Sequence, residues 1–147
     1  LIEADLDHPS LARRLGLDPE PGLSEYLAGD ASPRSVLQTM RLAGVHSGTV
    51  EPVLVCVPAG GASRGGDPFG ASRFAELVER VGRVYDLIVF DTSPLLAGPE
   101  ALEVARTVET NVLCARADAR PRELARAADR TAGTDTLGAV LLGSASG

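Results

Sequence analysis

Short, wholly apolar runs alternate with amphipathic segments along most of the chain. The apolar runs have the length of buried strands, and they lack the polar alternation of a strand with one face in water. We therefore expect strands at residues 1–4, 53–57, 87–90, 111–115 and 137–142.

The segments between these runs carry helical patterns. In the clearest one, Phe74, Leu77, Val78 and Val81 share one helical face, and Ser72 stands where it can cap the helix. Weaker patterns predict further helices at residues 9–17, 22–27, 33–42, 100–108 and 121–132.

The order of these elements indicates the fold class. Strands that are apolar throughout and alternate with helices are typical of a mostly parallel sheet that is covered on both faces. We therefore expect an α/β doubly wound fold, formed by a single domain over residues 1–147. No apolar run approaches the roughly 18 residues that a membrane-spanning helix needs.

The charged residues narrow the possible ligands. The net charge is -6, which argues against a general nucleic-acid binder, because such a protein needs a basic face. Phosphate ligands remain possible, since Mg²⁺ can neutralise them locally. Cys56 and Cys114 each lie inside an apolar run, which predicts buried, reduced thiols and no zinc motif.

Carboxylates follow two of the expected strands. The first strand leads into Glu3, Asp5 and Asp7, and the strand at residues 87–90 leads into Asp91. In open α/β sheets, ligands bind outside the carboxyl ends of the strands, and an aspartate there can hold a Mg²⁺ ion that bridges nucleotide phosphates. Asp91 alone could equally cap the following turn. The two acidic strand ends together favour a metal-dependent phosphate site.

These segments resemble the bacterial tyrosine kinases that control polysaccharide export. Residues 1–10, LIEADLDHPS, are similar to the Walker A′ motif, in which D-x-D follows an apolar strand. Residues 85–94, YDLIVFDTSP, are similar to Walker B, in which the strand runs into D-T-P-P. Residues 15–30 and the segments VLVCVPAG and PFGASRFAELVERV continue the similarity, which therefore covers nearly the whole chain.

The resemblance implies a deviant-Walker, P-loop NTPase-like fold and transfer of the γ-phosphoryl group of ATP to tyrosine. It implies catalytic roles for Glu3 and Asp5, and binding of Mg²⁺ and of the cofactor by Asp5 and Asp91. The implied cofactors are ATP and Mg²⁺. The implied partner is a membrane chain-length regulator of polysaccharide export, fused or separate, together with self-association through kinase domains and no nucleic acid. The implied location is cytoplasmic, at the inner face of the cell membrane through that partner.

The chain departs from the family's nucleotide-binding motif. A P-loop, G-x-x-x-x-G-K-[ST], needs a lysine that reaches the phosphates, but all 14 basic residues of this chain are arginines. We therefore expect the P-loop and its strand upstream of Leu1. The glycine-rich stretch at residues 60–66 comes after Walker A′, and it predicts a surface loop instead.

Further departures concern single side chains. Glu3 replaces the expected aspartate, and Asp7 stands where the family often has arginine, which should weaken ATP binding by like-charge repulsion. Leu142 occupies the place of an adenine-binding asparagine. The chain has two tyrosines and no tyrosine cluster: Tyr85 is predicted to be structural, and Tyr26 could be structural or exposed.

Three functions remain open at this stage. The first is a protein-tyrosine kinase domain, of which this chain would be a fragment that is inactive by itself. The second is a degenerate, non-catalytic regulatory module of the same fold, which the changes at Glu3, Asp7 and Leu142 favour. The third is a partition-type ATPase similar to ParA or MinD, against which the similarity of residues 15–30 to the kinases argues. Without the P-loop strand, the sheet should expose apolar surface and an unpaired edge, which predicts instability or aggregation.

Overall fold

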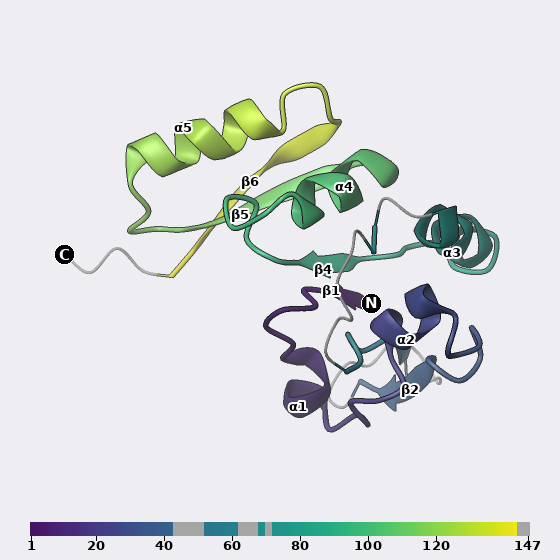
Figure 1. Ribbon diagram of the computed structural model, residues 1–147. Coiled ribbons are helices and arrows are strands. Elements are labelled where there is room, and N and C mark those ends of the chain that lie inside the picture. The colour runs from purple at the N-terminus through teal and green to yellow at the C-terminus, as the bar shows by residue number, and fades with distance from the viewer. Residues whose placement is uncertain (43–51, 62–67, 70–71, 144–147) are drawn as a thin grey trace. The chain divides into compact units, whose positions relative to one another are not determined.

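The computed structural model describes residues 1–42, 52–61, 68–69 and 72–143 (Figure 1). The chain divides into two compact units, Leu1–Ser93 and Pro94–Gly147, and each is described by itself. Helices alternate with strands, and two of the three strand pairs in the described residues are parallel, which confirms the α/β class. The single domain over the whole chain stays a prediction.

Strand β1 (Ile2–Ala4) lies between β4 (Phe90–Thr92) and the end of β3 (Val53–Cys56) in the first unit. It pairs in parallel with β4, and this register sets Glu3 opposite Asp91. On its other side, the N–H of Glu3 donates to the carbonyl of Val57 at 2.9 Å, just past β3. Because these strands run parallel, their carboxyl ends meet at one edge of the sheet.

Two of the predicted elements differ from the structure. The pattern predicts a helix at residues 33–42, but β2 (Gln38–Arg41) lies there and pairs antiparallel with β3. Hydrogen bonds to a neighbouring strand therefore override the local helical pattern. The strand predicted at residues 87–90 begins later, as β4, because its bonding to β1 starts at the carbonyl of Val89, which accepts from Ile2 N at 2.8 Å.

Helix α3 (Ser72–Gly82) packs an aromatic cluster into the core of the first unit. The residues Phe74, Leu77 and Val81, predicted to share one face, are all buried. The Phe74 ring meets the rings of Phe69 and Phe90 edge to face, at centroid distances of 5.0 and 5.7 Å. Such pairs add about 0.5–1.5 kcal/mol beyond the burial of their area. Phe90 of β4 is thereby held from the core side.

Two short helices follow β1. They are α1 (Leu11–Leu15) and α2 (Leu23–Ala28), which match the helices predicted at residues 9–17 and 22–27. The helix predicted at residues 9–17 extends beyond α1 at both ends. Helix α1 is terminated by Gly16, which adopts φ 67°, a left-handed conformation that favours glycine.

The start of α2 docks on the loop that follows β3. Leu23 N donates to Pro58 O, and Ser24 N donates to Ala59 O, both at 2.8 Å. Gly22 permits this approach, since a Cβ at that position would lie 2.3 Å from the backbone nitrogen of Gly60. The loop after β3 is therefore fixed by main-chain contacts with a helix that precedes it in the sequence.

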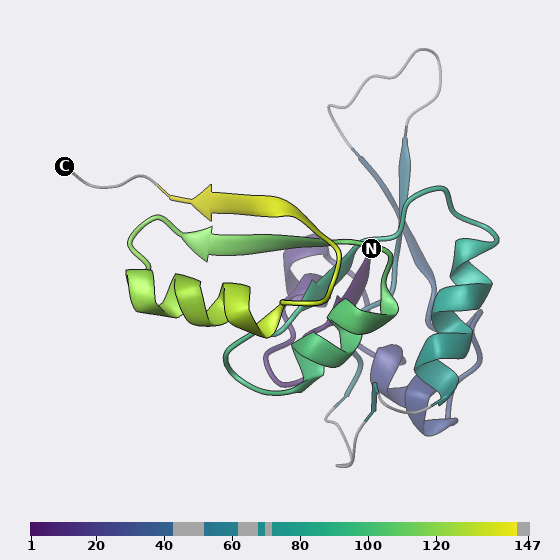
Figure 2. The ribbon, with the colours of Figure 1, turned by 90° about the horizontal axis from the view of Figure 1, so that it is seen from above.

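The second unit holds α4 (Glu100–Thr107), β5 (Asn111–Arg116), α5 (Pro121–Arg130) and β6 (Thr136–Leu142). Each matches a predicted element to within two residues at either end. Strands β5 and β6 pair in parallel, and α5 connects them and lies along the pair (Figure 2). This β-α-β arrangement is the repeating unit of a doubly wound sheet.

One face of the β5–β6 pair is exposed along both strands, and on β6 the opposite face is exposed as well, at Leu137 and Leu141. Val112, Val140 and Leu142 lie on the first of these faces with 51%, 45% and 54% of their surface exposed. Cys114 on the same face is exposed as well, so its predicted burial is wrong, whereas Cys56 is buried as expected. The strand at residues 111–115 was expected to be covered on both sides, and its alternating exposure shows that one side is open.

Candidate functional site

Two acidic strand ends meet at the carboxyl edge of the sheet in the first unit. Glu3 of β1 stands opposite Asp91 of β4, and Asp5 follows just after β1 ends. Partial burial raises the pKa of Asp91, and the negative charges of Glu3 and Asp5 raise it further, while the Arg14 guanidinium lowers it. Asp5 and Asp91, both predicted from the sequence, are therefore close enough to interact electrostatically.

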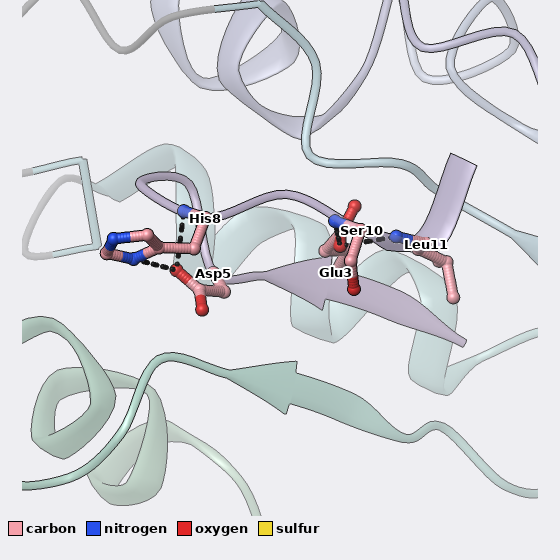
Figure 3. Close-up of polar contacts among 5 residues, drawn as sticks. All are labelled: Glu3, Asp5, His8, Ser10 and Leu11. Atoms are coloured by element: carbon pink, nitrogen blue, oxygen red, sulfur yellow. Dashed lines mark hydrogen bonds and ion pairs between the residues drawn. The ribbon is translucent and has the colours of Figure 1, made fainter. Parts of the chain in front are cut away.

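Glu3 carries its carboxylate into the interior, with 1% of the residue exposed. Its Oε1 accepts hydrogen bonds from the backbone N–H groups of Ser10 and Leu11, the latter at 2.7 Å (Figure 3). Its Oε2 accepts from the N–H of Ala59 at 3.1 Å. Three donors offset the desolvation of a buried carboxylate, and both of its oxygens are occupied by the protein's own backbone. The catalytic role of Glu3 stays a prediction.

Asp5 lies in the turn between β1 and α1, with 17% of its side chain exposed. Its Oδ1 accepts from the backbone N–H of His8 at 3.0 Å, and the Nδ1 of the exposed His8 ring lies 3.8 Å from the same oxygen (Figure 3). A carboxylate has acceptor sites for about four hydrogen bonds, so this turn leaves Asp5 with capacity for a ligand. Asp7, two residues further on, is exposed.

The carboxylates of Asp5 and Asp91 suit a small divalent cation. Mg²⁺ prefers oxygen ligands, and it relieves the like-charge repulsion that raises the pKa of Asp91. Among the residues that the structure describes, no three His, Cys, Asp or Glu side chains are grouped as metal ligands. An ion here would therefore complete its shell with water or phosphate oxygens, which is the usual arrangement for Mg²⁺ at nucleotides.

The other positions singled out from the sequence belong to the second unit or to the glycine-rich stretch. Leu142 ends β6 in the second unit. Residues 62–66 of the glycine-rich stretch are outside the described part of the chain. Its first members are described, and the N–H of Gly61 donates to Glu25 Oε1 at 2.9 Å. The beginning of this stretch is thus bound to α2.

Comparisons with known proteins give relatives of one kind. No family model matches the chain. The chain is 31% identical over 148 residues to the tyrosine-protein kinase Etk of Escherichia coli strain K12, which covers 97% of the chain and 19% of Etk. It is 27% identical over 122 residues to the tyrosine-protein kinase Ptk of Acinetobacter johnsonii, which covers 79% of the chain and 15% of Ptk. The chain thus spans a fifth or less of the length of these relatives.

A solved structure decides the assignment. The kinase domain of Escherichia coli Etk matches with a TM-score of 0.80 and 31% identity, over 97% of this chain and 54% of that domain. The chain is a homologue of the bacterial tyrosine kinase domains. The VpsO kinase domain matches this homologue with a TM-score of 0.79 and 26% identity, over 95% of the chain and 67% of that domain. The P-loop NTPase-like α/β fold implied by the sequence is thereby confirmed.

The tyrosines of this kinase-domain homologue differ in access. Tyr26 is 2% exposed, and the Arg73 guanidinium carbon lies 5.4 Å from the centre of its ring. Tyr26 is therefore a core residue, which is the structural alternative considered from the sequence. Its hydroxyl does not reach the solvent, as a phosphate-accepting hydroxyl must. Tyr85 is half-buried.

Two features of the site were missed from the sequence of this kinase-domain homologue. The positive charge of Arg14 lowers the pKa of Asp91, which is far away in the sequence. Nothing in the pattern around residue 14 indicates this interaction. The burial of Glu3 was missed as well, although Ser10 is a residue type that often begins a helix. That position signals free backbone N–H groups, which a carboxylate can bind.

Proposed function

We propose that this chain supplies the magnesium-binding part of an ATP-dependent protein-tyrosine kinase domain that regulates polysaccharide chain length and export. The observation that carries the proposal is the β1–β4 register, which aligns the two acidic strand ends with Asp5 and Asp91 in electrostatic contact. When bound, Mg²⁺ neutralises charge on the transferring phosphoryl group. The family membership of the relatives supports the reaction, and the proposal extends it to this chain.

Asp91 and Asp5 would hold the cation from two different positions in the fold. Asp91 follows Phe90, whose ring contacts the buried Phe74, and this contact together with the pairing of β4 with β1 fixes the backbone that carries the carboxylate. Asp5 is oriented by the N–H of His8, which holds one oxygen and leaves acceptor capacity on the carboxylate. Such fixed, preorganised charges are what phosphoryl transfer requires of a protein. The γ-phosphate-binding lysine is absent from these 147 residues, so we expect no kinase activity from the chain alone.

The partners follow from the same proposal. We propose that the kinase acts with a membrane chain-length regulator at the inner face of the cell membrane, and that kinase domains self-associate. The support is that the relatives are named as tyrosine-protein kinases, and that one of them, from Klebsiella pneumoniae, is named as a putative tyrosine-protein kinase in the cps region. No helix in the described part of the chain is long and apolar enough to cross a membrane.

A Mn²⁺ titration followed by NMR tests the cation site, because Mn²⁺ replaces Mg²⁺ and broadens nearby amide signals. We expect broadening centred on Asp5 and Asp91 in the 147-residue chain, and at least about a tenfold weaker affinity in Asp5→Asn and Asp91→Asn. Asp7→Asn is the matched control, since it removes the same charge from an exposed position in the same loop. Equal weakening in all three variants would show nonspecific attraction and refute the site.

A second function is favoured by two observations. Leu142 offers no amide to adenine, and Glu3 has both oxygens engaged by backbone N–H groups. These features suit a regulatory module that keeps the fold without the reaction. The coding sequence upstream of Leu1 separates the two: a strand followed by G-x-x-x-x-G-K-[ST] supports the kinase, and its absence supports the module.

A further inference from the structure

Three separate segments converge on the carboxylate of Glu3. The side chain leaves β1, its Oε1 receives the N–H groups of Ser10 and Leu11 at the start of α1, and its Oε2 receives the N–H of Ala59 after β3. The first two donors close the loop that carries Asp5. The third belongs to a segment more than fifty residues away in the sequence.

We propose that Glu3 is a positioning residue, which ties the Asp5 loop to the loop after β3 and thereby aims Asp5 at Asp91. This rests on the proposed cation site at Asp5 and Asp91. Glu3 itself then binds no metal, because it is 1% exposed and both its oxygens already accept hydrogen bonds.

The length and charge of the side chain fit this role. An aspartate is one methylene shorter and would draw the carboxylate back towards β1, away from the donors on α1 and after β3. A glutamine would keep the length but has a single acceptor oxygen, and its NH₂ group would face either Ala59 N–H or the Ser10 and Leu11 pair. Only glutamate provides two acceptor oxygens at this reach.

Glu25 provides a matched control, because it binds the same loop without touching the Asp5 segment. Its Oε2 accepts from Gly22 N at 2.7 Å and its Oε1 accepts from Gly61 N at 2.9 Å. Although partial burial acts in the opposite direction, these backbone hydrogen bonds hold the pKa of Glu25 below its usual value. Glu25→Gln therefore disturbs a carboxylate that binds two backbone N–H groups, one of which belongs to Gly61, two residues beyond Ala59. The hydrogen bonds of Glu3 stay in place.

The experiment compares the 147-residue chain with Glu3→Gln and Glu25→Gln by amide hydrogen exchange and by the Mn²⁺ titration. In Glu3→Gln we expect the amides of Ser10 and Leu11 to exchange at least about tenfold faster, and Mn²⁺ affinity at Asp5 to fall about 10–100-fold, the usual effect of losing a residue that orients a ligand. In Glu25→Gln we expect faster exchange at Gly22 and Gly61, with Mn²⁺ affinity changed less than about twofold.

The outcomes separate the two proposals. If Glu3→Gln weakens Mn²⁺ binding no more than Glu25→Gln does, Glu3 is merely structural and the positioning role is overturned. If the unmutated chain shows no Mn²⁺ broadening, the cation site is refuted, and so is the positioning of Asp5 for that site. The amide exchange then still reports whether Glu3 connects the Asp5 loop to the loop after β3. If Glu3→Gln does not fold, the unmutated chain decides: rapid exchange at Ser10 and Ala59 overturns the proposal, and Asp5-centred Mn²⁺ binding with slow exchange at both supports it.

Discussion

Replacement of Gly22 by alanine should separate α2 from the loop after β3. The added Cβ would lie 2.3 Å from Gly60 N and 2.4 Å from Pro58 O, and these are backbone atoms that cannot rotate away. Helix α2 must therefore shift, and the two 2.8 Å hydrogen bonds from Leu23 N and Ser24 N are lost or stretched.

The magnitude follows from those two bonds. A hydrogen bond contributes about 0.5–1.5 kcal/mol net, and a buried group left without its partner costs about 1–3 kcal/mol. Leu23 is fully buried, so water cannot replace the lost bond at its N–H without a larger rearrangement. We expect Gly22→Ala to lower the free energy of unfolding of the first unit by about 2–5 kcal/mol.

Tyrosine fluorescence during urea unfolding measures this change cleanly. The chain has no tryptophan, and both tyrosines, Tyr26 and Tyr85, lie in the first unit, so the signal reports that unit. Gly82→Ala is the control, because a Cβ there has nothing within 4 Å. It should leave stability unchanged or raise it by up to about 1 kcal/mol. A loss below about 1 kcal/mol in Gly22→Ala would refute the close approach as described.

Two further predictions concern charge and exposed apolar surface. The pKa of Asp91 is raised above its ordinary value of 3.8, so its contribution to stability is full below that value and is lost as the pH rises through the raised value. Asp91→Asn should therefore raise the free energy of unfolding at pH 7, followed by urea unfolding, by up to about 1 kcal/mol for a partly screened charge. This gain should vanish near about pH 3, and a gain that persists there would contradict the electrostatic cause. Val140→Thr should reduce the binding of a hydrophobic dye, because Val140 is 45% exposed. Val104→Thr should instead increase dye binding by loosening the core, because Val104 is 2% exposed. Equal effects of the two substitutions would show that the dye does not bind at the exposed face.

Much of the fold could be predicted because local patterns coincide with tertiary packing. The stripe of Phe74, Leu77 and Val81 forms one buried face of α3, since a helix places these positions together wherever it occurs. The helix predicted at residues 33–42 failed because the partner of β2 lies beyond it, at Val53–Cys56. A pattern within ten residues carries no information about such a partner.

The meeting of the two acidic strand ends was predictable to a similar degree. Asp5 and Asp91 could be chosen because acidic residues at the ends of parallel strands converge at one edge. The engagement of Glu3 could not be derived, since it depends on the distance from β1 to Ala59, which only the folded chain defines. The exposure of Cys114 also escaped prediction, because an apolar run does not reveal which side of a sheet is covered.

The alternation of neighbours along β4 links the core to the charged edge of the sheet. Phe90 packs against Phe74, and the next residue, Asp91, is partly exposed. Successive side chains of a strand point to opposite faces, so an insertion or deletion of one residue would turn the carboxylate inward and the ring outward. The length of this segment is therefore under two constraints at once. A change in the number of residues in β4 would therefore disrupt both the aromatic packing of Phe90 and the position of the Asp91 carboxylate.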